Sequence, residues 1–255
     1  MTYGYMPGLE QPGEFSVPIE RRLGGYAIGI IRTDCALPFL PGDVANATTF
    51  NFPVLYRLVK GVTPERIFAA EPALIDELIT AGKELEKEGV RAIGGTTCGF
   101  YGNFQKEVAA ALDVPVFLSS LLQVPLINRA LKPDQKVGII TANSTALTPK
   151  LLGSCGVDDL SRVVITGAQD LPEFKKLLLS TGHYNPAKIE PELVSLAKQL
   201  VKNNTDIGAI LLECAQLPTF AWAIQNAVRL PVFDFSTMIN WVYSAVVRRP
   251  FAGVI

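Results

Sequence analysis

The stretch AIGGTTCGFYG, Ala92 to Gly102, decides the fold because its character changes in the middle. Its first residues are apolar and strand-like, and glycines then interrupt the run. The next segment, NFQKEVAAALDV at residues 103–114, spaces its apolar residues as a helix does. A strand, a glycine-rich turn and a helix in succession predict a βα unit with Cys98 in its turn. Turns of this kind carry chemistry more often than the strands they follow.

The same unit occurs a second time in the chain. Cys214 also follows an apolar run, and it lies 116 positions after Cys98 (214 − 98). Two further pairs of strand-like segments correspond: VPVF at 114–117 with LPVF at 230–233, and IGII at 28–31 with VGII at 137–140. Repeated segments at nearly constant spacing indicate a duplicated structural unit. The two cysteines therefore occupy equivalent positions in the two copies.

Short apolar runs alternate with helical segments along both halves, which is typical of parallel α/β sheets. We predict an α/β fold of two similar parallel-sheet domains related by a pseudo-twofold axis, with the active site in the cleft between them. The predicted parts are an extended N-terminal arm at 1–24, a first domain at 25–120 plus 236–255, and a second domain at 121–235. Parallel sheets bind ligands at the carboxyl ends of their strands. Both thiols should therefore face the shared cleft.

Composition narrows the kinds of partner. The 255 residues include 23 Lys and Arg against 24 Asp and Glu, and 49% are hydrophobic. This balance gives no reason to expect nucleic acid or a membrane as a partner, and a small carboxylic acid fits better. Four scattered cysteines without a CxxC pair predict neither a disulfide framework nor a metal site. We expect a cytoplasmic protein, with the N-terminal arm as a candidate interface of a homo-oligomer.

Two thiols on opposite sides of a ligand suit proton transfer at carbon. A thiol at the start of a helix ionises more readily, and both Cys98 and Cys214 precede predicted helices. One thiolate would remove a proton next to a carboxylate or carbonyl, and the other thiol would return a proton to the opposite face. The pair therefore predicts a racemase or epimerase that needs no cofactor and no metal.

Polar residues near the strand ends are candidates for binding the substrate carboxylate. Hydroxyls, amides and free N–H groups at such positions form anion-binding sites. The predicted substrate-binding residues are Thr33, Thr97, Gly99, Asn143, Ser144, Thr145 and Gln216. The segment TANST, residues 141–145, could equally be a simple helix cap. A long loop at residues 41–54 either shapes the pocket or covers a sheet edge.

The flanks of the two cysteines resemble those of a known family. GGTTCGF, TANST and LLECAQLP at 211–218, together with the duplication, are similar to the aspartate/glutamate racemase superfamily. That group includes amino-acid and hydantoin racemases, maleate isomerase and arylmalonate decarboxylase. The resemblance implies two domains, an active site between them and a last helix that returns to the first domain. Gly99 stands where amino-acid racemases commonly have asparagine, and Glu213 where many members have glycine, which implies a different substrate.

Two other functions fit the same residues. Maleate-type cis–trans isomerisation would use one thiolate as a nucleophile. A binding protein for small acids would keep the cleft without turnover. Cys155 is predicted to serve packing, and Trp222 and Trp241 are predicted to lie in the core. Cys35 is predicted to serve packing, with lining of the cleft as the alternative, and His183 is predicted to lie in a solvated loop, with a place in a lid over the cleft as the alternative.

Overall fold

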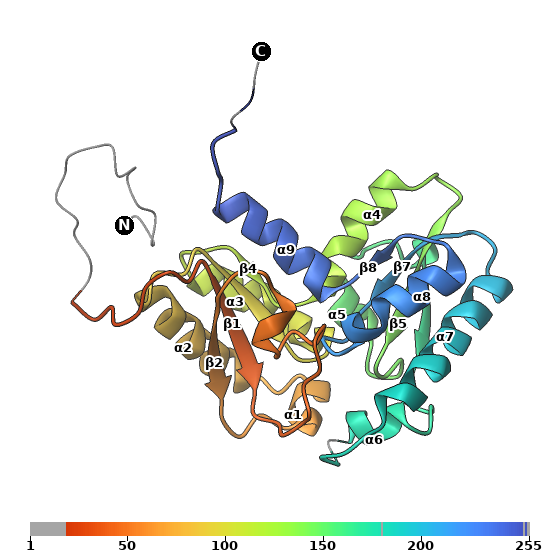
Figure 1. Ribbon diagram of the computed structural model, residues 1–255, viewed down its shortest axis with the longest axis horizontal. Coiled ribbons are helices and arrows are strands. Elements are labelled where there is room, and N and C mark those ends of the chain that lie inside the picture. Colours follow the sequence, from red (N-terminus) through yellow and green to blue (C-terminus); the bar gives the residue numbers. More distant parts are fainter. Residues whose placement is uncertain (1–18, 180, 252, 254–255) are drawn as a thin grey trace.

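Two four-stranded parallel sheets form the centre of the molecule (Figure 1). The structure is a computed structural model that describes residues 19–179, 181–251 and 253. The first sheet has the order β2-β1-β3-β4, with β1 at Ile28–Thr33, β2 at Val54–Val59, β3 at Ala92–Thr96 and β4 at Val116–Phe117. The second has the order β6-β5-β7-β8, with β5 at Lys136–Thr141, β6 at Val163–Gly167, β7 at Ile207–Leu212 and β8 at Val232–Phe233.

The strand order of the second sheet repeats that of the first, strand for strand, and every pairing is parallel. The predicted α/β fold with two similar sheets is confirmed. The limits predicted for the two domains stay a prediction, and residues 1–18 of the predicted arm lie outside the described residues.

Helices connect the strands within each half. The α-helices are α1 (Pro64–Phe68), α2 (Leu74–Lys87), α3 (Gln105–Ala111), α4 (Val124–Ala130), α5 (Pro149–Ser154), α6 (Phe174–Leu178), α7 (Pro186–Asn203), α8 (Ala221–Val228) and α9 (Phe235–Val246). The 3₁₀ turns are η1 (Ala47–Thr49), η2 (Gly99–Phe104), η3 (Ser120–Gln123), η4 (Leu160–Arg162) and η5 (Leu217–Phe220). Among the described residues, no helix is long and apolar enough to cross a membrane.

Glycines at matching positions of β1 and β5 let a helix approach each sheet closely. A Cβ on Gly29 would lie 2.9 Å from Leu85 of α2. A Cβ on Gly138 would lie 3.1 Å from Leu200 of α7. Both distances are tighter than ordinary carbon contacts, so a side chain at either position would push the helix outward. The duplicated segments IGII and VGII thus perform the same packing role in both halves.

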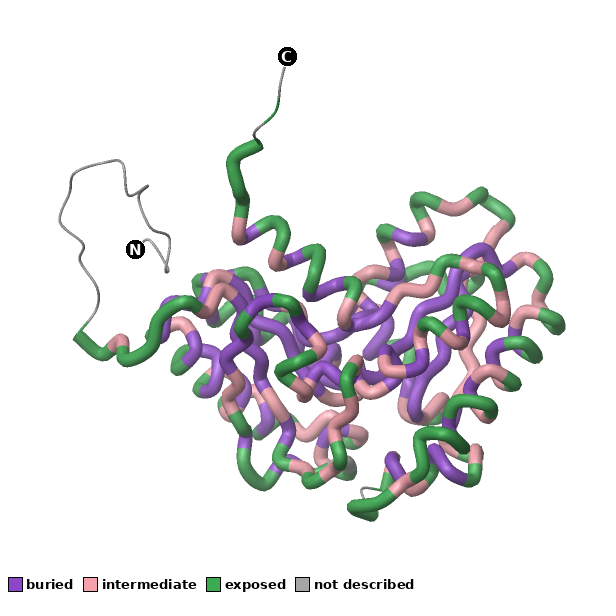
Figure 2. Tube along the Cα trace, in the orientation of Figure 1, coloured by how far each residue is buried: buried purple, intermediate pink, exposed green. Residues whose placement is uncertain are grey.

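The core continues from one half into the other (Figure 2). One cluster of buried side chains joins Phe100 and Tyr101, which follow β3, to Ile139 of β5 and Leu151 of α5. These side chains are removed from water only while the halves stay together. Hydrophobic burial therefore holds the two sheets in fixed relation.

The last helix, α9, packs on the first sheet although it follows the last strand of the second. Phe235, Met238 and Ile239 share a buried cluster with Ile28 and Ile30 of β1. The side chain of Asp234 accepts a hydrogen bond from the backbone N–H of Thr237 (2.7 Å), which caps the start of this helix. The chain thus crosses back to the first half, as the resemblance implied.

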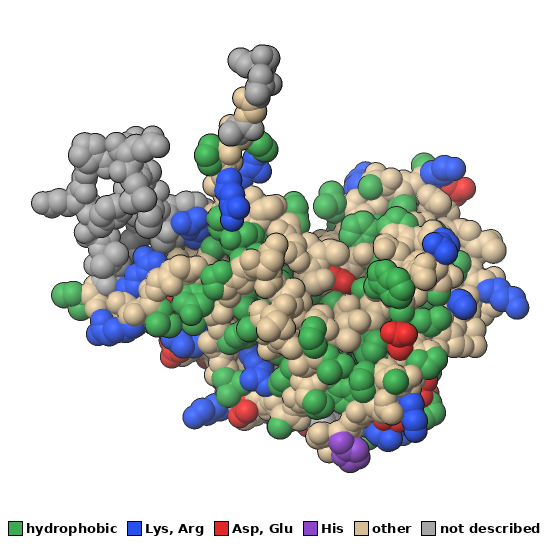
Figure 3. Space-filling view, in the orientation of Figure 1, with side chains coloured by type: hydrophobic (Ala, Val, Ile, Leu, Met, Phe, Trp, Pro, Cys, Tyr) green, Lys and Arg blue, Asp and Glu red, His purple; other side chains and the backbone are tan. Residues whose placement is uncertain are grey.

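The prediction that Trp222 and Trp241 belong to the core is wrong. They lie on the outer faces of α8 and α9 and are 76% and 56% exposed. Amphipathic helices leave one face to solvent, and smaller apolar residues such as Ile224 and Ile239 fill the inner face. On the face drawn in Figure 3, apolar side chains are interspersed with polar ones, and charged side chains of both signs lie mostly towards the edges.

Candidate active site

The turns that follow β3 and β7 bring Cys98 and Cys214 together. Their Sγ atoms are 3.2 Å apart, and both thiols are free. Two backbone hydrogen bonds flank the pair: Gly99 N–H to Glu213 O (3.1 Å) and Ala215 N–H to Thr97 O (3.2 Å). The pair therefore stands where the carboxyl ends of the two sheets meet, as the repeat predicted.

The arrangement of the thiols differs from the predicted one. Two sulfurs 3.2 Å apart are in direct contact, so no substrate carbon fits between them. Cys214 is buried, with 1% of its surface exposed, whereas Cys98 is partly exposed and lines a cavity. A ligand in this cavity would meet the pair from one side only.

The pKa of the Cys98 thiol also differs from the sequence-based prediction, which was that a thiol at the start of a helix ionises more readily. Its hydrogen bond with Cys214, followed by burial, raises the pKa of the Cys98 thiol well above its usual value. The helix effect is small because Cys98 precedes a short 3₁₀ turn, η2, and not a regular helix. The contact with a second sulfur and the burial both disfavour a thiolate at Cys98, so that thiolate, once formed, is a strong base.

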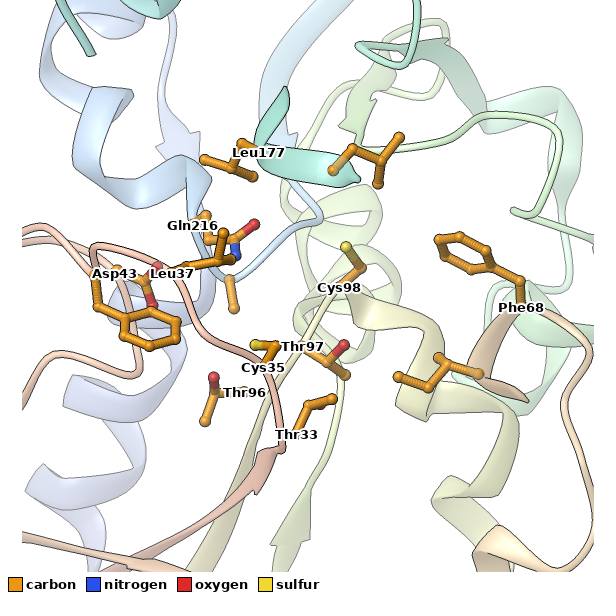
Figure 4. Close-up of a pocket in the computed structure, with 14 residues that line it drawn as sticks. Thr33, Cys35, Leu37, Asp43, Phe68, Thr96, Thr97, Cys98, Leu177 and Gln216 are labelled. Atoms are coloured by element: carbon orange, nitrogen blue, oxygen red, sulfur yellow. The ribbon is translucent and has the colours of Figure 1, made fainter. Parts of the chain in front are cut away.

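A cavity of about 60 Å³ lies beside Cys98 (Figure 4). It is lined by Thr33, Cys35, Leu37, Phe39, Asp43, Ile67, Phe68, Thr96, Thr97, Cys98, Leu177, Leu178, Ala215 and Gln216. One enclosed water needs a cavity volume of about 10–15 Å³, so this cavity is large enough for a small molecule. Both halves contribute to its wall, through the ends of β1 and β3 on one side and α6 and the turn after β7 on the other.

Four of the predicted site residues line this cavity: Thr33, Thr97, Cys98 and Gln216. Gln216 also contacts the buried thiol, because Cys214 Sγ donates to its Oε1 at 3.4 Å. The Thr33 hydroxyl is shared with Tyr101, at 3.0 Å between the two oxygens. These residues stay the candidates for binding substrate.

The predicted binders Asn143, Ser144 and Thr145 are not among the residues lining the cavity. The side chain of Asn143 accepts from the N–H and hydroxyl of Thr145, at 3.0 and 2.7 Å. The hydroxyl of Ser144 accepts from the amide of Gln169 at 3.1 Å. Their polar groups are thus used locally, in agreement with the alternative of a structural turn.

Gly99 also lies away from the cavity lining, against a buried carboxyl. A Cβ on Gly99 would stand 2.7 Å from Ser119 Oγ and 2.8 Å from Glu213 Oε1. The side chain of Glu213 is completely buried, and its Oε2 accepts from the Thr141 hydroxyl at 2.8 Å. Burial raises the pKa of the Glu213 carboxyl to about 7. Glycine is required after Cys98 because the glutamate from the other half fills the space of a side chain.

Asp43 is the acidic side chain in the cavity wall, and it was not predicted as a site residue. It belongs to the loop between β1 and β2 and is 3% exposed. Burial raises the pKa of its carboxyl to about 7. Cys35 also lines the cavity, which was the alternative to its predicted role in packing. The one prediction that concerned this wall was that the loop at residues 41–54 either shapes the pocket or covers a sheet edge.

Comparison with solved structures defines the class of the fold. The allantoin racemase of Klebsiella pneumoniae superimposes with a TM-score of 0.58 at 18% identity, over 86% of this chain and 88% of that one. Unliganded arylmalonate decarboxylase gives 0.54 at 16%, over 87% and 92%. The glutamate racemase of Bacillus anthracis gives 0.54 at 12%, over 86% and 82%. The fold is that of the aspartate/glutamate racemase superfamily, which confirms the resemblance.

Sequence comparison with characterised proteins is more specific, whereas no family model matches the chain. Dimethylsulfoniopropionate lyase of Durusdinium sp. clade D is 35% identical over 234 residues, 89% of this chain and 77% of the relative. Dimethylsulfoniopropionate lyase 7 of Emiliania huxleyi is 36% identical over 240 residues, 89% of this chain and 69% of the relative. The chain belongs to the dimethylsulfoniopropionate lyase family.

This relationship overturns the predicted function. The chain belongs to a family of enzymes, but their class is lyase, so the predictions of a racemase and of a cis–trans isomerase are wrong. The fold is shared with racemases, and the predicted function rested on the resemblance to them. Fold alone does not determine the reaction.

Proposed function

We propose that this protein cleaves dimethylsulfoniopropionate to dimethyl sulfide and acrylate. The proposal is supported by 35–36% identity to lyases named for this substrate. The structural observation that carries it is the Cys98 thiol at the wall of a small cavity, in contact with a second thiol. An elimination requires one base next to the carboxylate, and it does not require a second group on the opposite face.

The protons and electron pairs of this elimination can be accounted for with the thiols of the site. Cys98 loses its own proton first, and its thiolate then removes a proton from the carbon next to the carboxylate, because Cys98 is the member of the pair that lines the cavity. The electrons of the C–H bond form the carbon–carbon double bond, and the carbon–sulfur bond breaks with its electron pair going to sulfur. Dimethyl sulfide leaves as a neutral molecule, so no acid is needed to protonate it. The pair returns the proton to solvent before the next cycle.

The remaining predicted residues have roles that fit this reaction. We assign binding of the carboxylate to Thr97, Gln216 and the hydroxyl of Thr33, which line the cavity beside Cys98. When Cys98 is the thiolate, the S–H of Cys214 turns from Gln216 Oε1 to donate to Cys98 Sγ, 3.2 Å away. Because the mechanism requires free thiols, we propose that the enzyme works in a reducing compartment such as the cytoplasm.

The test is to incubate the protein with dimethylsulfoniopropionate and to measure dimethyl sulfide in the headspace and acrylate by NMR. Cys98→Ser and Cys214→Ser should each lower kcat at least about 100-fold, because serine is a much weaker acid than cysteine. Cys155→Ala is the control: this thiol is buried in the core and does not line the cavity, so activity should persist. Deuterium at the carbon next to the carboxylate should slow the wild type. A folded wild type that releases no dimethyl sulfide would overturn the proposal.

A further inference from the structure

The cavity contains an unusual set of charges for a site that receives a carboxylic acid. Among its lining residues, Asp43 is the acidic one, and none is lysine, arginine or histidine. A site built only for an anion would place a cation in its wall. This wall instead offers a carboxyl together with the rings of Phe39 and Phe68. Carboxylates and aromatic faces are the groups that bind organic cations.

The carboxyl of Asp43 is free to meet a ligand. Its Oδ1 accepts the Ala45 N–H at 2.7 Å, and no hydrogen bond or ion pair joins Oδ2 to any residue that the structure describes. Arg32 is near enough to act on it electrostatically. However, the Arg32 guanidinium lies over the Phe39 ring at 4.4 Å and donates to Cys35 O at 2.9 Å. Asp43 is only 3% exposed, and an ionised carboxyl at such a position is costly unless a cation arrives.

The position of Asp43 relative to the Cys98 thiol matches a zwitterionic ligand. In Figure 4, Asp43 and Leu37 lie on one side of the cavity, Phe68 lies on the opposite side, and Cys98 lies between them. The hydroxyl of Thr97, which also lines the cavity and is assigned above to the carboxylate, is left for the anionic end of the ligand. A ligand that spans these groups carries a positive and a negative end on a short carbon chain.

We propose that Asp43 is the counter-ion for the sulfonium group of the substrate, with the ring of Phe39 as an apolar wall for its methyl groups. This inference rests on the proposed function and deepens it, because it assigns the specificity of the site to a residue that the motifs do not contain. Asp43 acts on binding more than on the rate of cleavage. The positive charge disappears as the carbon–sulfur bond breaks, so a carboxylate beside it stabilises the bound substrate more than the transition state.

The test compares two inhibitors that have nearly the shape of the substrate. In 3-(trimethylammonio)propionate the cation is retained, whereas in 4-methylpentanoate a neutral CH replaces the sulfonium. The wild type should bind the cationic compound at least about tenfold more tightly, and Asp43→Asn should abolish that preference. For the substrate, Asp43→Asn should raise KM about tenfold or more with kcat unchanged or higher. Asp43→Glu should restore part of the preference.

A matched control comes from the same loop. Asp34 is exposed and does not line the cavity, so Asp34→Asn removes the same charge and should keep the wild-type preference. Binding is measured by calorimetry, without turnover. If Asp43→Asn folds and keeps the preference within twofold, the inference is wrong even when the lyase is active. If the wild type prefers the cation but releases no dimethyl sulfide, the counter-ion role stands and the proposed reaction fails.

Discussion

Glu213 is the single residue at which ionisation and folding are most closely linked. Its carboxyl is completely buried, and its Oε1 has no hydrogen-bond partner among the described residues. The Thr141 hydroxyl and the Ala142 N–H favour the ionised form, but burial outweighs them and raises the pKa to about 7. Cys98, Cys214 and Cys155 are the titratable groups that surround it. The neutral carboxylic acid is therefore the form that the fold prefers.

We expect stability to fall as the pH rises from about 5 to 8. In this range the unfolded chain has already lost the proton of Glu213, whereas the folded protein holds it until the pH passes about 7. The stabilisation is thus complete below the unfolded pKa and lost above the folded one. Glu213→Gln should remove a decline on the order of 2 to 3 kcal/mol in the free energy of unfolding. Asp43, whose pKa is also about 7, would keep part of the decline.

Urea unfolding of wild type and Glu213→Gln at several pH values measures this effect. Glu107→Gln is the control, because Glu107 is an exposed carboxyl on α3 and should leave the slope unchanged. Equal slopes for wild type and Glu213→Gln would show that Glu213 is ionised throughout the range.

Single residues also show what the sequence could and could not predict about the site. Cys98 and Cys214 were found because the duplication preserves their spacing and strand-end turns survive divergence. Asp43 was missed because its burial depends on the second half closing over the loop, which no local pattern records. Residues 143–145 were overestimated because hydroxyl and amide side chains that could bind an anion can also satisfy each other.

At the level of elements, the alternation of strands and helices was predictable because each βα unit has its own local periodicity. The conformation of the turn after Cys98 was less predictable. A helix was expected soon after the glycines, but η2 occupies Gly99–Phe104 before α3 begins at Gln105. Glycine lowers helix propensity, and the close contacts of Gly99 and Gly102 with the other half fix the tighter turn.

The loop between β1 and β2 is the element that carries Asp43 to the cavity. Val44 N–H donates to Ala215 O at 3.1 Å, which ties the loop to the turn after β7. Gly42 has a φ of +100°, and a Cβ there would lie 2.5 Å from Thr219 Cα on η5. The position of the acid therefore depends on a glycine that fits against the opposite half.

Gly42→Ala should displace this loop and weaken substrate binding. We expect a loss of about 1–3 kcal/mol in the free energy of unfolding and a raised KM, since Asp43 follows directly. Gly61→Ala is a matched control, because Gly61 also has a positive φ (+72°) but no atom lies within 4 Å of its Cβ position. Gly61→Ala therefore has the energetic cost of an alanine at positive φ, but its Cβ does not clash with a neighbouring element. If both variants show the same stability and the same KM, then the fit of Gly42 against η5 does not position the acid.

For the whole molecule, the shared core predicts that the two halves unfold together. The buried cluster that contains Phe100 and Tyr101 also contains Leu151, and the site itself consists of turns from both sheets. Separating the halves would expose this apolar surface and break the backbone hydrogen bonds around the thiols. Each half also lacks the wall of the cavity that the other supplies. Neither half is then expected to persist when the other unfolds.

Gly102→Ala tests this coupling at the contact between the halves. A Cβ on Gly102 of η2 would lie 2.5 Å from Cys155 Sγ and 2.8 Å from Leu151 of α5. The variant should lose about 1–3 kcal/mol and melt several degrees lower, still in one transition with equal calorimetric and van't Hoff enthalpies. Gly153→Ala, on α5 with no atom within 4 Å of its Cβ position, should melt at or above the wild-type temperature. Two separate transitions in Gly102→Ala would instead mean that each sheet is stable on its own, and that the halves of the enzyme come together only to complete the site.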